Sequence, residues 1–529
     1  PEEARAARVR ELLAGMTLRE KVGQLFLIRP ESLCGDLTPE QVNDAHRYGV
    51  TGWSAQMEEQ LRAYPAGGVV LFGKNLSSPP QLTAFLSAMQ RASALPLLTG
   101  IDEEGGAVSR LANAPGFDLP RYESMAAVGA TGSINFMIIG FCLGVCSGFA
   151  IPVAQKFGEK NDSALRRFVA NSGWLAAIFS VVMTLAVCVL CRDILLWMDT
   201  PADIFDGAYR YIFVIFLGIP ATYLYNLLSC TIRSLGDSTT PLIFLLFSSV
   251  LNVALDFFTI LVLNMGVAGA GWATITAQAV SGLLCLLYMR KKFTILKMQG
   301  DEWKPRKDYM KILCGMGIPM GLQYSITAIG SVILQTAVNS LGSMAVAAVT
   351  AGSKIVIFLC CPFDALGSTI ATYGGQNVGA GKLDRIAPGM KACLYLGIVY
   401  AVAALGVLYL FGDQIALLFV DRGETELLRN TRMFLLGNGL LFIPLVFVNV
   451  MRFLIQGMGF SRFAILAGVC EMIARSFVGF VLVPRFGYIA VCFASPVAWV
   501  AADLFLIPAY GYVMKQLRRM FAGRNADLA

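Results

Sequence analysis

Beyond residue 133 the sequence is built almost entirely of apolar runs separated by short polar turns. A membrane-spanning helix needs about 20 consecutive apolar residues, and eleven runs meet that requirement. They lie near residues 134–154, 171–191, 208–230, 241–262, 267–288, 312–341, 344–371, 389–411, 433–450, 463–483 and 488–513. The chain is therefore predicted to be a mainly α-helical, polytopic membrane protein with about eleven transmembrane helices. Residues 1–125 contain no such run and are predicted to form a separate segment.

Basic residues are concentrated in particular loops between these runs. The 529 residues are 56% hydrophobic and 15% charged, with a net charge of +7. Lys and Arg gather at 156–167, 290–311 and 515–524. Because cytoplasmic loops carry an excess of Lys and Arg, these segments are predicted to face the cytoplasm. The protein is predicted to lie in a bacterial-type cytoplasmic membrane. The net positive charge is therefore explained by membrane topology, so it does not indicate nucleic-acid binding. Membrane lipid is a predicted partner.

The stretch 251–278 places a carboxylate inside an apolar run. Asn252 and Asp256 are one helical turn apart and therefore share a helix face. A carboxylate at the membrane centre costs about 2.5–3.5 kcal/mol on insertion scales, so it needs a partner, a cavity or a function. After a glycine-rich turn, Thr274 supplies a hydroxyl that would complete an oxygen-rich site. A site for H⁺ or Na⁺ and a packed polar pair both remain open.

Other polar residues in the apolar runs have structural alternatives. Glu471 and Arg475 stand at i and i+4, which predicts a structural ion pair. Gln323 and Lys354 either line a cavity or serve packing and helix-end contacts. The chain has a single histidine among 13 cysteines, so no Cys/His metal site and no cofactor are predicted.

The apolar region also repeats itself at one fixed offset. Four positions recur 221 residues later with the same residue type: Gln155 as Gln376, Gly158 as Gly379, Gly236 as Gly457 and Gly266 as Gly487. One constant offset indicates two homologous helical lobes. The run 312–341 has no counterpart, because residues 91–120 are too charged to span a membrane. The first lobe is therefore predicted to lack its first helix.

The first 125 residues have the pattern of an α/β protein. A capping box opens a helix at Thr17. Short apolar runs bounded by glycine at 67–73 and 96–101 predict buried parallel strands, with a helix over 80–94 between them. Acidic residues follow the second strand, as at the C-terminal ends of α/β-barrel strands. The segment is predicted to be a small, partial α/β unit, a truncated TIM barrel.

Three motifs in this segment, MTLREKVGQLF, GGVVLFGKN and GIDEEGGAVSRL, resemble family 3 glycoside hydrolases of the β-N-acetylhexosaminidase type. The resemblance implies that Asp102 is a remnant sugar-binding residue. Ala107 stands where the family usually has Arg. The family's catalytic acid/base and nucleophile both lie beyond the matched residues, and a complete barrel needs about 250 residues. The segment is therefore expected to be inactive, and the chain not to be an enzyme.

The remainder resembles the multidrug and toxic compound extrusion (MATE) transporters, on motifs that occur in order. They are AAVGATGS, GEKNDSALRR, IRSLGDSTTP, LNVALDFF, GVAGAGWATITAQ, GQNVGAGKLDRI and IQGMGFSR. The resemblance implies two six-helix lobes and export of small cationic or amphipathic compounds by H⁺ or Na⁺ antiport. It also implies a cation-coupling site in the first lobe, for which the matching residues are Asp256, Asn252, Thr274 and Asn226.

These observations predict three parts: residues 1–125, a first lobe over 126–300 that lacks one helix, and a second lobe over 301–529. Both resemblances meet at 121–133, so recombination or a sequence misjoin is expected there rather than a selected fusion. The predicted function is multidrug efflux by a monomer, impaired by the missing helix. The alternatives are a membrane-anchored hexosaminidase fragment and a non-functional chimera.

Overall fold

The computed structural model describes residues 11–43, 48–101, 114, 116–117, 131–198, 200, 202–417, 419 and 424–526. The chain divides into two compact units. The first contains residues 1–130, 194–211 and 265–268, and the second contains all the others. Asp102 and most of the predicted junction at 121–133 lie outside the described residues.

The N-terminal part of the first unit contains a small parallel sheet with short helices. Its strands, in spatial order, are β1 (Leu27–Ile28), β2 (Gly68–Leu71) and β3 (Leu98–Ile101), and its α-helices are α2 (Leu18–Gly23), α3 (Pro39–Asn43), α4 (Ala55–Ala63) and α5 (Pro79–Ala92). The predicted capping box forms between Thr17 and Glu20. Val69 on β2 is fully buried, in one cluster with Phe85 and Met89 of α5. Both predicted strands and the helix between them are found at these positions, but only β2 is buried as predicted. β3 is largely exposed, with Leu98 at 69%, so its predicted burial is wrong.

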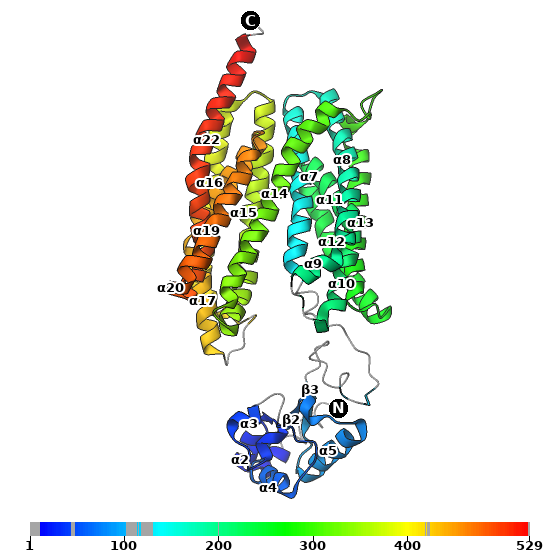
Figure 1. Cartoon of the computed structure of the whole chain (residues 1–529), viewed down its shortest axis with the longest axis vertical. Helices are drawn as coiled ribbons and strands as arrows, with labels where there is room; N and C mark the ends of the chain where they lie inside the picture. The colour runs from blue at the N-terminus through cyan, green and yellow to red at the C-terminus, as the bar shows by residue number, and fades with distance from the viewer. Residues whose placement is uncertain are drawn as a thin grey trace. The chain divides into compact units, whose positions relative to one another are not determined.

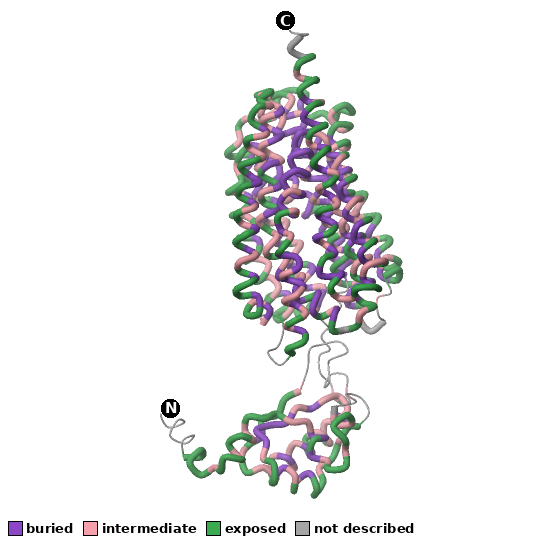
Figure 2. Tube along the Cα trace, turned by 90° about the vertical axis from the view of Figure 1, so that its left-hand side faces the viewer, coloured by how far each residue is buried: buried purple, intermediate pink, exposed green. Residues whose placement is uncertain are grey.

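The helices that follow form two lobes (Figure 1). The N-lobe consists of α7 (Gly132–Gly158), α8 (Asp162–Val189), α9 (Cys191–Trp197), α10 (Ala202–Leu217), α11 (Ile219–Ser234), α12 (Thr239–Phe257) and α13 (Gly266–Lys292). The C-lobe consists of α14 (Lys307–Asn339), α15 (Ser343–Gly379), α16 (Ile386–Ala416), α17 (Thr425–Leu440), α18 (Phe442–Gly457), α19 (Arg462–Phe477), α20 (Val483–Phe486), α21 (Tyr488–Cys492) and α22 (Ala494–Ala526). Buried residues concentrate in the interior of this helical part (Figure 2).

Within the described residues, nine helices are long and apolar enough to cross a membrane, and eleven if each of two bent pairs counts as one span. The pairs are α10 with α11, bent by 46°, and α17 with α18, bent by 50°. Pro220 stands in the first turn of α11, and Pro444 in that of α18. Proline lacks the N–H that would continue the preceding helix, which explains a break at these places. The predicted spans 208–230 and 433–450 each cross such a break, and counting each bent pair as one span gives the predicted total of eleven among the described residues.

The two lobes share structural details at, or within one residue of, the offset predicted from sequence. α12 continues into a π-helix, η4 (Phe258–Val262), and α19 continues into a π-helix, η7 (Val478–Leu482). Gly266 and Gly487, 221 residues apart, both have a left-handed backbone, with φ of 58° and 59°. Only glycine adopts this conformation without strain. A rare helix type and a left-handed glycine therefore recur at matching places in both lobes.

The lobes meet along α7, which packs against α14 and α15. The glycines spaced along α7 allow close packing: a Cβ at Gly148 would lie 2.5 Å from Gly317 Cα. The end of the same interface is symmetric. A Cβ at Gly158 would lie 2.0 Å from the carbonyl oxygen of Gln376, and one at Gly379 would lie 1.8 Å from that of Gln155. These four residues are two repeat-related pairs, so the contact follows the internal repeat.

The amide side chains of the same pairs also cross between the lobes. Gln155 Nε2 donates to the carbonyl oxygen of Gly457 at 3.3 Å, and Gln376 Nε2 donates to that of Ser234 at 2.9 Å. The lobes are therefore closed against each other at the end where the basic loop after α7 begins. The positive-inside rule predicts that this end faces the cytoplasm.

Candidate cation-coupling site

One of the two predicted polar residues of α12, Asn252, contacts α13. Asn252 and Asp256 lie one turn apart on α12 and are both half-buried. Asn252 Nδ2 lies 3.5 Å from Thr274 Oγ1 on α13, at the limit of a hydrogen bond. The Thr274 hydroxyl donates to the carbonyl oxygen of Ala270 at 3.0 Å. The structure thus brings together an amide and a hydroxyl that the sequence separates by 22 residues.

Asp256 has a carboxylate oxygen without a partner. Its Oδ1 is buried and forms no hydrogen bond with any residue that the structure describes. The hydroxyl of Thr259 donates to the main-chain oxygens of Leu255 and Asp256 at 2.9 and 3.4 Å, so it does not serve the carboxylate. A buried acceptor without a donor is costly, and here a proton or a cation would satisfy it.

Asn226 lies on α11, and its one recorded hydrogen bond stays within that helix. Its Nδ2 donates to the carbonyl oxygen of Thr222, in its own helix, at 2.8 Å. The link between α11 and α13 is made instead by Thr222, whose hydroxyl donates to Gln278 Oε1 at 2.7 Å. Gln278 was not predicted, although it stands one turn after Thr274 and hence on the same helix face. That spacing was the available signal.

The C-lobe holds a buried ionic cluster. Glu471 and Arg475 of α19 pair as predicted, with 3.8 Å between Oε2 and Nη2. Arg452 of α18 makes a closer pair with Glu471, and all three side chains are buried. The partner on α18 was missed because sequence spacing reveals ion pairs within one helix but not between helices.

The remaining predicted polar residues have structural contacts. Gln323 of α14 is buried and accepts a hydrogen bond from Gln456 of α18. Lys354 is exposed, with its Nζ 5.9 Å from the ring centroid of Phe419. Neither residue lies in the group formed by Asn252, Asp256 and Thr274.

A protein-family model described as MatE matches residues 121–258 and 319–481, more than half of the chain. The chain belongs to the MatE family. It is thus a multi-pass membrane protein of a transporter family whose bacterial members lie in the cytoplasmic membrane. The two matched ranges fall in the two lobes.

Named relatives of this MatE chain are bacterial. It is 26% identical to the Probable multidrug resistance protein YoeA of Bacillus subtilis over 312 aligned residues. The alignment covers 57% of this chain and 67% of YoeA. It is 23% identical to the Multidrug export protein MepA of Staphylococcus saprophyticus over 347 aligned residues. That alignment covers 64% of this chain and 76% of MepA.

Solved structures share the MatE fold. An outward-facing multidrug resistance MATE transporter superposes with a TM-score of 0.71 at 19% identity, over 75% of this chain and 89% of that one. A transporter of the MOP superfamily from Pyrococcus furiosus gives a TM-score of 0.69 at 18% identity, over 75% and 88%.

Proposed function

We propose that this MatE protein exports small cationic or amphipathic compounds by antiport with H⁺ or Na⁺, and that Asp256 with Asn252 and Thr274 holds the coupling ion. The observation that carries the proposal is the buried Asp256 Oδ1, which lacks a partner among the described residues. YoeA and MepA, whose names refer to multidrug resistance and export, support the substrate class.

The chemistry of these groups suits either ion. A proton on Asp256 would neutralise the carboxylate and turn it into a donor. A sodium ion would instead keep the carboxylate charged, with the oxygens of Asn252 and Thr274 available as further ligands. Binding of a cationic substrate nearby would be favoured when the carboxylate is free. The ion and the substrate would then bind in alternation, as antiport requires.

We further propose that α12 lacks a neighbour that α19 has. In the C-lobe, α14 packs on α19 and η7, where Glu471 of α19 and Val478 of η7 are 3% and 1% exposed. The repeat-related residues of α12, Val250 and Phe257, are 72% and 64% exposed. No helix among the described residues covers α12 as α14 covers α19. A helix equivalent to α14 would fit on this face, and we expect transport to be stronger when this face is covered.

The experiment uses purified protein in liposomes that are loaded with a fluorescent cation. A gradient of H⁺ or of Na⁺ is imposed, and efflux is followed for the chain in which residues 1–125 are replaced by the first helix of a MatE transporter. Efflux that follows one of the gradients supports antiport. Efflux that ignores both gradients, or no efflux at all, contradicts it.

Residues 1–125 are proposed to be a fragment without hydrolase activity, because neither catalytic group of the family that they resemble is present in the match. Losing one essential group commonly reduces turnover by orders of magnitude. Assay of the purified chain with a chromogenic β-N-acetylglucosaminide tests this. Turnover above a buffer blank would support the alternative of a membrane-anchored hexosaminidase.

A further inference from the structure

The N-lobe contains a cavity of about 850 Å³ that the coupling site does not use. It lies between α8, α11 and α13 and is bounded at one end by residues 293–303, which connect α13 toward α14. None of Asn252, Asp256 and Thr274 lines it. Its volume is in the range of sites for small molecules, about 300–1,000 Å³.

Close contacts between α11 and α13 lie beside the cavity. A Cβ at Gly218, which caps α11, would lie 2.2 Å from Ile275 Cγ1 of α13, and one at Gly282 of α13 would lie 2.9 Å from Leu224 Cγ of α11. Leu224 and Leu228 of α11 and Leu286 of α13 line the cavity, so its wall between these helices is apolar.

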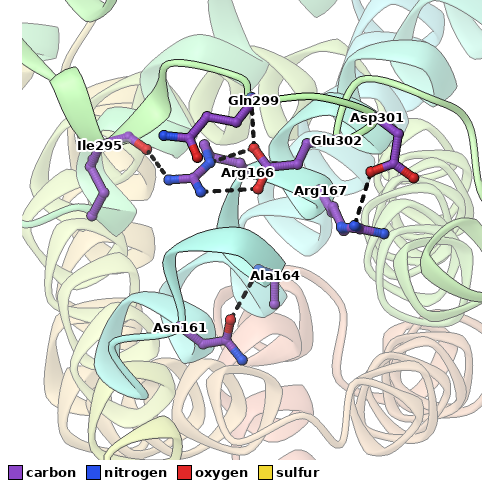
Figure 3. Close-up of polar contacts among 8 residues, drawn as sticks. All are labelled: Asn161, Ala164, Arg166, Arg167, Ile295, Gln299, Asp301 and Glu302. Carbon is purple, nitrogen blue, oxygen red and sulfur yellow. Dashed lines mark hydrogen bonds and ion pairs between the residues drawn. The ribbon is translucent and has the colours of Figure 1, made fainter.

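The segment that bounds the cavity is fastened to α8 (Figure 3). Arg166 makes two hydrogen bonds with Glu302, of 2.5 Å from Nε and 2.9 Å from Nη2, and donates to the carbonyl oxygen of Ile295 at 3.3 Å. Arg167 pairs with Asp301 at 3.1 Å. Trp174 Nε1 donates to the carbonyl oxygen of Trp303 at 3.0 Å. These contacts hold the 293–303 segment in place against α8.

The charges at the cavity have one sign. Arg290 and Lys297 line it, both are exposed, and neither has an ion-pair partner in the part of the chain that the structure describes. The nearby acids Asp301 and Glu302 are already paired with Arg167 and Arg166. An apolar body with a cationic rim attracts an anionic amphiphile and repels a cation. The cavity is thus unsuited to the cationic compounds proposed as substrates.

The C-lobe has a hollow at the related place. A space of about 520 Å³ is lined by residues of α22 that include Tyr510, Met514 and Arg518, together with Ala387 of α16. At the 221-residue offset, Tyr510 and Met514 correspond to Met289 and Phe293, which line the N-lobe cavity. Both lobes therefore carry an apolar hollow with basic residues that lie on their last helix or, for Lys297, shortly after it. Basic pockets between helices on the cytoplasmic side are suited to acidic lipid head groups.

We propose that the N-lobe cavity binds an acidic phospholipid of the cytoplasmic leaflet, with its acyl part between α8, α11 and α13 and its phosphate at Arg290 and Lys297. The proposal does not depend on transport. It places a lipid-binding site beside the segment that joins the two lobes.

Bromine-labelled lipids quench tryptophan on contact, and Trp174 and Trp303 line the cavity. The full chain in detergent is titrated with phosphatidylglycerol or phosphatidylcholine that carries bromine on the acyl chains. The signal from the cavity is the difference between the parent and the Trp174→Phe/Trp303→Phe variant. We expect saturable quenching by phosphatidylglycerol and weaker, non-saturating quenching by phosphatidylcholine.

Two further variants test the charges and the space. Arg290→Ala/Lys297→Ala should weaken phosphatidylglycerol binding about 10-fold or more, whereas Lys304→Ala/Lys307→Ala, which removes two exposed cations that do not line the cavity, should not. Gly173→Leu should also reduce binding, because Gly173 lines the cavity and a Cβ there meets no atom within 4 Å. Equal quenching by the two lipids, or equal loss in the two double variants, would overturn the proposal.

Discussion

Asp256 is the residue on which ion coupling rests in the proposed mechanism. In the chain in which residues 1–125 are replaced by the first helix of a MatE transporter, Asp256→Asn should reduce ion-driven efflux about 10-fold or more, because an amide neither ionises nor takes up a proton. Asn252→Ala should have a smaller effect, since it removes one neutral ligand.

The control for both variants is Asp413→Asn, which changes an exposed acid of α16 that pairs with Arg432. Its efflux should equal that of the parent. If Asp256→Asn retains the response to H⁺ and Na⁺ gradients, the assignment of Asp256 is wrong.

Glu471 is held by two arginines in the interior of the C-lobe. Glu471→Gln would leave the charges of Arg452 and Arg475 without their carboxylate, and breaking a buried ion pair in this way costs about 3–5 kcal/mol. The thermal midpoint of the purified protein should fall clearly. Asp413→Asn serves again as control, because an exposed pair contributes about 0–1 kcal/mol. Equal midpoints for the two variants would show that the buried cluster is not stabilising.

At the level of single residues, the sequence predicted some polar contacts and missed others. Asn252 and Thr274 were found from helical spacing and resemblance, and the structure brings them together. Arg452 and Gln278 were missed, because their contacts join helices that are packed by tertiary structure. Periodicity along one helix carries no information about such partners.

Among the elements, the 293–303 segment has an acid whose titration should be visible. Hydrogen bonds from Arg166 lower the pKa of Glu302 from 4.5 to about 2. Since folding favours the charged form, its stabilisation is complete above about pH 4.5 and is lost as the pH falls toward 2. Glu302→Gln should lower the thermal midpoint at pH 7 and reduce its dependence on pH between 4.5 and 3.

The comparison for Glu302→Gln is Asp301→Asn, because Asp301 also pairs with an arginine of α8 but has a side chain that is 57% exposed. This variant should change the midpoint and its pH dependence little. If the parent and Glu302→Gln lose stability in parallel on acidification, the ion pair with Arg166 is not the source of the effect.

The contact between α7 and α15 requires glycine on both sides. Gly158→Val or Gly379→Val would push a side chain into a carbonyl oxygen of the other lobe, and such overpacking costs about 1–3 kcal/mol. We expect spin labels on the two lobes to show a larger separation at this end. Gly412→Val, where a Cβ meets nothing within 4 Å, is the control. Unchanged distances in Gly158→Val would contradict the tight contact.

Helix positions were largely predictable from the apolar runs, since length and hydropathy decide which segments can cross a membrane. The bends after α10 and α17 were not, because both predicted runs continue across the break. Pro220 and Pro444 were available as signals. Whether a proline bends a helix or starts a new one depends on how neighbouring helices satisfy the freed carbonyl groups.

For the whole molecule, the internal sequence repeat was the main basis for predicting the architecture. It predicted two lobes, and matching π-helices and left-handed glycines accord with it. The repeat also relates the exposed residues Val250 and Phe257 of α12 to buried positions in the C-lobe, which α14 covers. Apolar side chains are tolerated in contact with lipid. A carboxylate such as half-buried Asp256 is not, and it would need a neighbouring helix to shield it from lipid.

The decisive measurement compares ion-driven efflux of a fluorescent cation by three proteins in liposomes. They are the chain as given, the chain with residues 1–125 replaced by the first helix of a MatE transporter, and the same replacement with a scrambled helix of equal composition. We expect rapid efflux only from the second protein, and its loss in Asp256→Asn. Equal efflux by all three proteins would contradict the proposal that a helix covering α12 supports transport. It would also contradict the proposal that the coupling site lies at Asp256 on α12.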